Sequence, residues 1–156
     1  MIDTPLMAEK YELYQYQVNI RRVIDGDTVN VDIDLGFGII LRDEMVRIQG
    51  VDTPECRTTD MEEKIFGMAA KHFVSSLLPP NTTQVMRTVL DKSGDATKGK
   101  FGRILADFYI TDGKMLSDAI MENHHGVPYD GGDRDLLEAM HQANRDILIS
   151  SGAVRV

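Results

Sequence analysis

Three short segments of this sequence carry residues that could perform chemistry together. Asp25-Gly-Asp-Thr28 and the stretch from Arg47 to Glu55 supply four carboxylates and an arginine from two predicted strand ends. Lys100-Phe-Gly-Arg103 adds a second arginine in front of another apolar strand pattern. Carboxylate oxygens bind hard divalent cations, and guanidinium groups bind phosphate oxygens in a planar, bidentate way. The combination favours hydrolysis of a phosphodiester, with one spare carboxylate available for a water proton.

The candidate cation ligands are Asp27 and Asp52, because each lies where a strand meets a turn and is therefore both rigid and accessible. Either segment alone is equally well explained by turn chemistry, an Asp-Gly turn in one case and an Asx-type cap in the other. The presence of both segments, together with Glu55 and Arg47, favours a site. Glu55 could polarise a water molecule. Alternatively, it could be a surface glutamate near the start of the following helix, where the helix dipole stabilises a negative charge.

Arg47 and Arg103 are the candidate phosphate ligands. Arg47 alternates with the apolar residues Val46 and Ile48, so its side chain should point away from the face that they bury. A solvated strand arginine is the alternative in both cases. Tyr129 could stack on a nucleic-acid base, or it could cover the core as an ordinary loop aromatic.

Two further residue groups favour ordinary structural roles. His124-His125 could bind a metal ion, but a solvated helix end explains the pair more simply. Cys56 is the only cysteine, so no internal disulfide can form, and no histidine lies near it in the sequence to activate it.

Composition sets the broad limits. The chain has 156 residues, of which 42% are hydrophobic, enough for one domain with a core of its own. No apolar run approaches the length of a membrane span, and no basic and apolar leader begins the chain, which predicts a cytoplasmic location and no membrane partner. The formal net charge of −8 disfavours strong non-specific binding to nucleic acid, so a nuclease of this composition should bind its substrate weakly and with marked salt sensitivity.

The elements that must position these residues follow from hydrophobic periodicity. Residues 1–13 show no pattern and are expected to be flexible, and residues 14–152 are expected to form a single domain. Alternating residues predict strands at 14–20, 29–35, 45–51, 84–91 and 104–110. Helices are predicted from Thr59 or Asp60 to the Pro79-Pro80 pair, at 114–123 and at 133–150.

Two details of the predicted helices can be checked. The first should begin with a capping box that uses Glu62 or Glu63, and the last should bury a face made of Leu136, Met140, Ala143 and Ile147. Five strands, with a helix between the third and fourth and helices after the fifth, are the element order of an OB-fold barrel. The predicted fold is therefore α+β, a five-stranded OB-fold barrel with three helices.

The motifs, taken in order, resemble those of the staphylococcal nuclease (thermonuclease) family. The resemblance rests on Asp25 to Thr28, Arg47 to Glu55, Lys100 to Arg103 and Asp112 to Met115, and it covers roughly Val18 to Pro128. It implies a calcium-dependent nuclease with an OB-fold that cuts DNA and RNA and leaves 3′-phosphate ends. Single-stranded or locally melted DNA, or RNA, would be the partner.

Carried over position by position, the resemblance gives each residue a role. Asp27 and Asp52 resemble the calcium carboxylates, and Thr53 would supply its backbone carbonyl. Glu55 resembles the residue that orients or deprotonates the attacking water. Arg47 and Arg103 resemble the pair that binds the scissile phosphate. Lys100 and Tyr129 resemble substrate-binding residues.

The departures lie around these residues. Phe101 replaces a tyrosine of the family, Gly131 stands where a second stacking tyrosine would fall, and the hairpin from Asp34 to Glu44 is about six residues longer. The longer hairpin resembles forms carried by bacteriophages, which implies action in a host cytoplasm. A non-catalytic OB-fold module that binds nucleic acid or protein, and a site that binds calcium only for stability, are the alternatives. Manganese or magnesium could also replace calcium.

Overall fold

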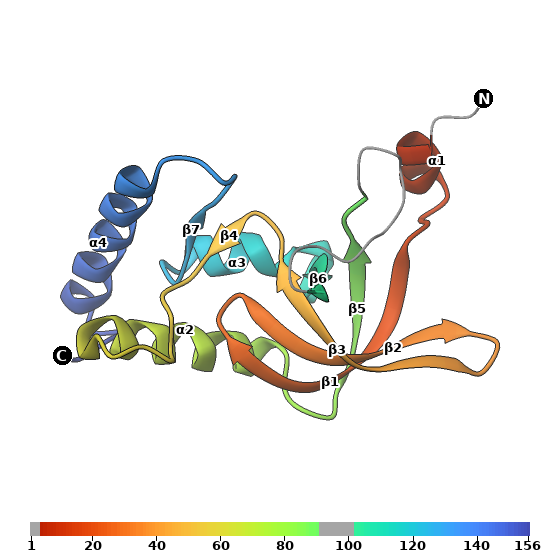
Figure 1. Ribbon diagram of the computed structural model, residues 1–156, viewed down its shortest axis with the longest axis horizontal. Coiled ribbons are helices and arrows are strands. Elements are labelled where there is room, and N and C mark those ends of the chain that lie inside the picture. The colour runs from red at the N-terminus through yellow and green to blue at the C-terminus, as the bar shows by residue number, and fades with distance from the viewer. Residues whose placement is uncertain (1–3, 91–101) are drawn as a thin grey trace.

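A closed β-barrel forms the body of the molecule in the computed structural model, which describes residues 4–90 and 102–156 (Figure 1). Its strands are β1 (Gln15–Asp25), β2 (Thr28–Gly36), β3 (Ile39–Ile48), β5 (Thr83–Thr88) and β6 (Ile104–Tyr109). They close in the order β1-β2-β3-β6-β5, with every pair antiparallel except β3 and β6. The predicted five-stranded OB-fold barrel is confirmed.

The barrel interior is filled by the residues whose alternation predicted the strands. Val18 and Ile20 of β1 and Val29 and Val31 of β2 are almost completely buried. Leu35 continues the same alternation but is exposed, because β2 runs on past the barrel into a projecting hairpin with β3. Periodicity predicted which face turns inward but not where the barrel wall stops.

The third predicted strand differs most from the structure. β3 begins at Ile39, directly after the Gly36-Phe-Gly38 turn, and ends at Ile48, before Gly50 turns the chain with a φ of +78°. The chain then forms a separate strand, β4 (Val51–Asp52), which pairs with β7 (Val127–Pro128). Asp52 therefore lies outside the barrel sheet, on a short ribbon beside it.

Helix α2 (Met61–Leu77) begins where the sequence predicts. The carboxylate of its N-cap, Asp60, accepts hydrogen bonds from the backbone N–H groups of Glu62 (3.0 Å) and Glu63 (3.2 Å). The capping box is incomplete, because the Glu63 carboxylate accepts instead from the backbone N–H of Glu55 at 3.2 Å. The first turn of α2 thus contacts a predicted site residue.

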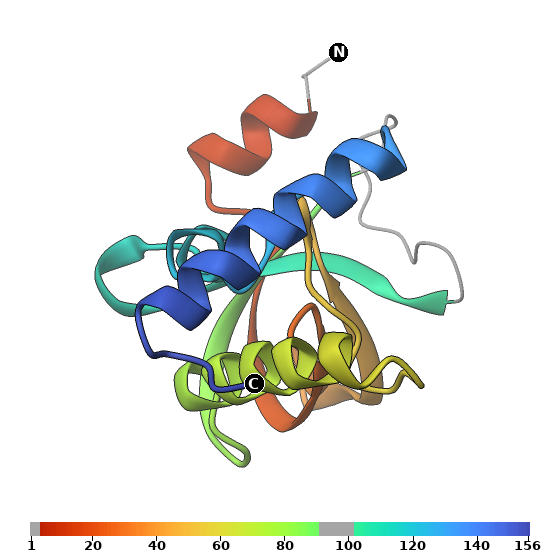
Figure 2. The ribbon, with the colours of Figure 1, turned by 90° about the vertical axis from the view of Figure 1, so that its left-hand side faces the viewer.

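Helix α4 (Arg134–Ser150) has nearly the predicted bounds but not the predicted buried face. Leu136 and Ile147 are 59% and 42% exposed, whereas Leu148 is buried in a small cluster with Phe66 of α2 and Val154. Two different sides of α4 could have packed against the molecule, and the more apolar side, which carries Leu136 and Ile147, faces outward. The stripe that faces the rest of the molecule is mixed, with Leu137 and Leu148 beside His141 and Asn144, and α4 crosses in front of the barrel above α2 (Figure 2).

The remaining helices are α1 (Thr4–Lys10), α3 (Leu116–Glu122) and a short 3-10 turn, η2 (Thr111–Gly113). Within the described residues there are four α-helices rather than the expected three, because α1 forms inside the segment expected to be flexible. The sequence of α1 lacks a periodic pattern, so nothing in it predicted a helix. None of the helices in the described part of the chain is long and apolar enough to cross a membrane.

Candidate active site

The turn between β1 and β2 holds Asp27 in a buried position. Gly26 permits this, because a Cβ at its position would lie 2.8 Å from Cβ of Ala70 and 3.0 Å from the side chain of Thr53. Asp27 is 6% exposed, and its carboxylate accepts hydrogen bonds from the Thr53 N–H (3.2 Å) and the Thr28 hydroxyl (3.0 Å). The two motif segments are therefore joined through this carboxylate.

Arg47 connects the two candidate cation ligands. Its guanidinium donates to the backbone carbonyls of Ile48 (2.9 Å) and Val51 (2.8 Å), which fix its orientation. Its Nη1 lies 3.4 Å from Asp27 Oδ2, and its Nη2 lies 3.7 Å from Asp52 Oδ1. Only 13% of the side chain is exposed, so Arg47 is not a solvated strand arginine.

The electrostatics of this cluster favour an additional positive charge. Burial raises the pKa of Asp27 above its ordinary value, against the opposing attraction of Arg47, and the charge of Asp52 raises it further. Partial burial also raises the pKa of Glu55, and the neighbouring carboxylates, Asp25 among them, add to this effect. The carboxylates are close enough to repel one another, and a cation among them would relieve that repulsion.

The backbone around Glu55 is held against α2. A Cβ at Gly67 would lie 2.3 Å from the carbonyl oxygen of Glu55, so only glycine allows this approach. On the other side, Asp25 Oδ1 accepts from both the Sγ (2.6 Å) and the backbone N–H (3.3 Å) of Cys56. Burial, reinforced by the contact with Asp25, raises the pKa of the Cys56 thiol to about 11, which makes it unreactive and agrees with the expected spectator role.

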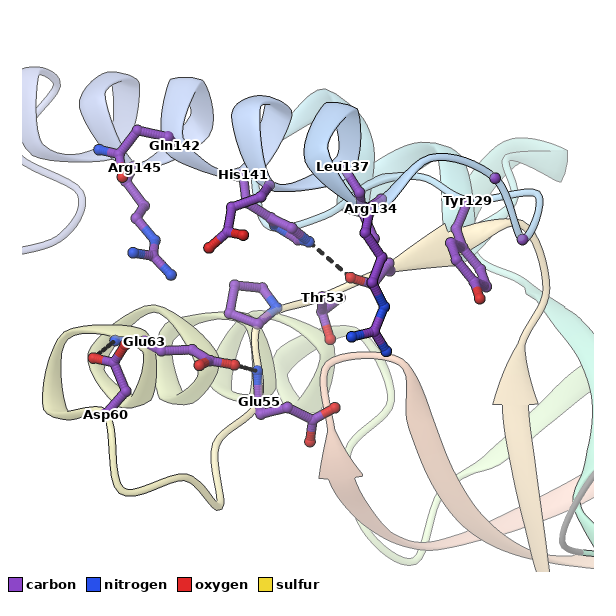
Figure 3. Close-up of a pocket in the computed structure, with 15 residues that line it drawn as sticks. Thr53, Glu55, Asp60, Glu63, Tyr129, Arg134, Leu137, His141, Gln142 and Arg145 are labelled. Atoms are coloured by element: carbon purple, nitrogen blue, oxygen red, sulfur yellow. Dashed lines mark hydrogen bonds and ion pairs between the residues drawn. The ribbon is translucent and has the colours of Figure 1, made fainter.

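A pocket of about 480 Å³ opens beside this cluster, between α4 and the start of α2 (Figure 3). Asp52, Thr53, Glu55 and Tyr129 line it together, so four of the predicted site residues share one cavity. Tyr129 is 44% exposed, and its backbone N–H is fixed by the Gly50 carbonyl at 3.0 Å. The volume is in the range of small-molecule sites, enough for part of a nucleotide.

The opposite wall of the pocket comes from α4 and was missed by the sequence analysis. Arg134, His141 and Arg145 line the cavity, and Figure 3 shows them extending from α4 toward it. His141 Nε2 lies 2.7 Å from Asp52 Oδ2. The sequence did contain a signal for this wall. Polar and basic residues recur along α4 at intervals of three and four residues, on a different side from the apolar stripe that we expected to be buried.

Arg103 lies just before β6, after Gly102, whose φ is +70°. The parallel register pairs Arg47 with Leu105, so a residue two positions before Leu105 belongs to the same sheet face as Arg47. Leu105 therefore shares the outer face of the barrel with Arg47, and Arg103 precedes Leu105 by two residues. Lys100 lies outside the described residues.

The candidate histidines His124 and His125 are separate from the acidic cluster. His125 stacks on Phe73 at a centroid distance of 4.8 Å, and burial lowers its pKa. Over residues 4–90 and 102–156, no group of three or more His, Cys, Asp or Glu side chains is arranged to hold a metal ion. A cation at the acidic cluster would therefore need carbonyl or water oxygens in addition to carboxylates.

The donor set fits such a cation. Asp27 and Asp52 offer two hard carboxylate ligands, and both lie beside the guanidinium of Arg47. Calcium and magnesium fill their other coordination positions with backbone carbonyl and water oxygens. The buried Thr53 hydroxyl oxygen has no hydrogen-bond partner within the described part of the chain, which leaves a polar atom beside Asp27 to be satisfied. Soft-metal chemistry is disfavoured, because these ligands are all oxygens.

Comparison with known proteins identifies the family of the chain. Residues 45–145 match the family described as staphylococcal nuclease homologue. A thermonuclease of Staphylococcus intermedius is 38% identical over 110 residues, which cover 70% of this chain and 58% of that protein. The chain thus spans less than two thirds of the length of this relative. The matched region includes Arg47, Asp52, Glu55 and Arg103, and the chain belongs to the staphylococcal nuclease family.

Proposed function

We propose that this protein is a calcium-dependent nuclease that hydrolyses phosphodiester bonds of DNA or RNA and leaves 3′-phosphate ends. The observation that carries the proposal is the mostly buried guanidinium of Arg47 held between Asp27 and Asp52. A mostly buried guanidinium beside two carboxylates suits a tetrahedral phosphate that approaches with a cation, and the pocket that Asp52 lines has room for part of a nucleotide. The similarity to a thermonuclease supports the same activity.

Each residue has a task in this mechanism. Arg47 and Arg103 bind the non-bridging oxygens of the scissile phosphate and stabilise the charge that grows on them. Glu55 orients a water molecule for attack on phosphorus and accepts its proton, a role favoured by a carboxylate whose pKa is raised above its ordinary value by partial burial. The P–O5′ bond breaks, so the phosphate stays on the 3′ side, and the leaving 5′ oxygen takes up a proton from solvent while Glu55 returns its proton to solvent.

Asp27, Asp52 and the carbonyl of Thr53 would hold the cation. When bound, calcium supplies positive charge that polarises the phosphate and compensates the repulsion among the carboxylates. Manganese or magnesium could serve instead, because carboxylate ligands do not discriminate strongly among these ions. Tyr129 stacks on a base at the edge of the pocket, and Lys100 would add a phosphate contact.

One observation favours a second candidate, a catalytically weak module that binds nucleic acid or protein. The pocket is lined by five acidic residues and two arginines, and the whole chain has a charge of −8. A polyanion should therefore bind weakly in the absence of a divalent cation. Weak binding without cutting in the presence of calcium would indicate this alternative.

The test is a gel assay of the purified protein on heat-denatured DNA and on RNA, with calcium and with chelator. We expect calcium-dependent cutting that falls by at least about 10²-fold in Glu55→Gln and about 10³-fold in Arg103→Ala. Radiolabelled ends identify the product phosphate as 3′ or 5′. Intact substrate with folded protein in calcium, manganese and magnesium would exclude the nuclease, and cutting that survives both substitutions would place the chemistry elsewhere.

A further inference from the structure

We infer that His141 is a positioning residue that fixes the Asp52 carboxylate for cation binding. The inference rests on the proposed function, because it gives Asp52 its role as a cation ligand. The starting observation is the 2.7 Å contact between His141 Nε2 and Asp52 Oδ2, which joins residues 89 positions apart in the sequence. The contact links the C-terminal helix directly to the acidic cluster.

Asp52 needs such support because few contacts hold its side chain. It belongs to a strand of only two residues, β4, which pairs with the equally short β7. Its side chain is 27% exposed, and its other oxygen lies at 3.7 Å from Arg47, a long ion pair. By contrast, Asp27 is held by two hydrogen bonds and is almost fully buried. The carboxylate of Asp52 is therefore the cation ligand whose orientation depends most on a neighbour.

The chemistry of the contact sets its direction. An ionised carboxylate is an acceptor only, so the Nε2 of His141 must donate to Oδ2. The hydrogen bond occupies one lone pair of Oδ2 and sets the plane of the carboxylate, and other lone pairs remain for a cation. Hydrogen bonds of this kind to ligating carboxylates commonly change metal affinity by 10- to 100-fold.

Helix α4 holds His141 rigidly at this place. Within the next two turns, Asn144 donates to the Gly126 carbonyl at 3.1 Å, and the Arg145 guanidinium lies over the ring of Phe66 at 5.3 Å. Leu148 is buried beneath them. The His141 side chain is only 14% exposed. The stripe of α4 that faces the molecule thus has two parts, one that anchors the helix and one that reaches the site.

The test measures cation affinity in the absence of nucleic acid. His141→Gln retains an N–H donor on a side chain of similar reach, and His141→Met has a similar shape without a donor. We expect calorimetry to give a calcium Kd about 10-fold weaker in H141M and within about 3-fold of the wild type in H141Q. Ile147→Ala, on the exposed side of the same helix, should leave the Kd close to that of the wild type.

A second readout separates positioning from folding. In the nuclease assay, excess calcium should restore most of the rate of H141M, because saturation compensates for weaker binding. Equal calcium affinities in folded H141M and wild type would overturn the inference while leaving the nuclease intact. A wild type that neither binds calcium nor cuts would overturn both proposals. If H141M does not fold in chelator, His141→Ala replaces it, and loss of folding there too would make His141 a packing residue and overturn the inference.

Discussion

Gly67 of α2 and Glu55 approach each other so closely that any side chain at position 67 would collide with the site. A Cβ on Gly67 would lie 2.3 Å from the Glu55 carbonyl oxygen and 2.7 Å from the Cys56 nitrogen, both backbone atoms that cannot rotate away. The contact places the segment carrying the proposed general base directly on a rigid helix. The position of Glu55 is therefore set by the helix as much as by the motif that contains it.

Gly67→Ala should impair catalysis more than stability. Overpacking of this kind costs about 1–3 kcal/mol, and alanine recovers up to about 1 kcal/mol of helix propensity. Displacement of Glu55 by about 1 Å should lower kcat by up to 10²-fold with a smaller change in KM. Lys64→Ala, at an exposed position of the same helix, is the control. An unchanged kcat in G67A would show that the Glu55 segment adapts freely.

Asp27→Asn should stabilise the protein in metal-free buffer at neutral pH. Burial raises the pKa of Asp27 above its ordinary value of 3.8, so the folded state binds the proton more tightly than the unfolded chain. The stability that this carboxyl contributes is fully present below pH 3.8. It is lost as the pH rises through the raised pKa that Asp27 has in the folded protein. The Tm of D27N minus that of the wild type should thus increase from pH 3.5 to pH 7, as measured by thermal melts.

Calcium should reverse the order of the melting temperatures, so that the wild type melts above D27N. A ligand at 100 times its Kd stabilises the folded state by about 2.7 kcal/mol, which corresponds to about 5–10 °C in Tm for a chain of this size. The wild type should gain this increment at pH 7, and D27N should gain little. An equal gain in both would remove Asp27 from the proposed cation site.

Arg134→Ala should weaken substrate binding without changing the chemical step. Arg134 lines the pocket from the first turn of α4 and extends into it in Figure 3, opposite a predominantly acidic wall. We expect KM for single-stranded DNA to rise several-fold with kcat nearly unchanged, and the slope of log KM against log salt to fall by about 1. Arg155→Ala, an exposed arginine on another face, is the matched control. A fall in kcat instead would assign Arg134 to the transition state.

Cys56 should resist alkylation as long as the site is intact. Cys56 is 3% exposed, and burial raises the pKa of its thiol to about 11, so little thiolate exists at pH 8. Labelling by iodoacetamide should be on the order of 10²-fold slower in the folded protein than in denaturant. Rapid labelling of the folded protein would mean that the contact between Asp25 and Cys56 opens easily and does not hold the Glu55 segment in place.

The sequence by itself determined the barrel and which residue types the candidate site contains. Alternation in β1, β2 and β6 reports which side chains turn inward, because side-chain direction in a strand has a period of two. The spacing of Asp27, Arg47, Asp52 and Glu55 indicated oxygen ligands beside a phosphate-binding group, since residue type fixes which atoms can bind. These features depend on local geometry and composition, both of which are written in the chain.

Only the tertiary structure decided which side of α4 faces the site. Helical periodicity identified Leu136 and Ile147 as an apolar stripe, but burial depends on what lies opposite, and α2 and β4 lie opposite the mixed side that carries His141 and Leu148 instead. The contact between His141 and Asp52 and the approach of Gly67 to Glu55 join residues that are far apart along the chain or on different elements. No local pattern encodes such pairs, because they arise from the packing of whole elements against one another.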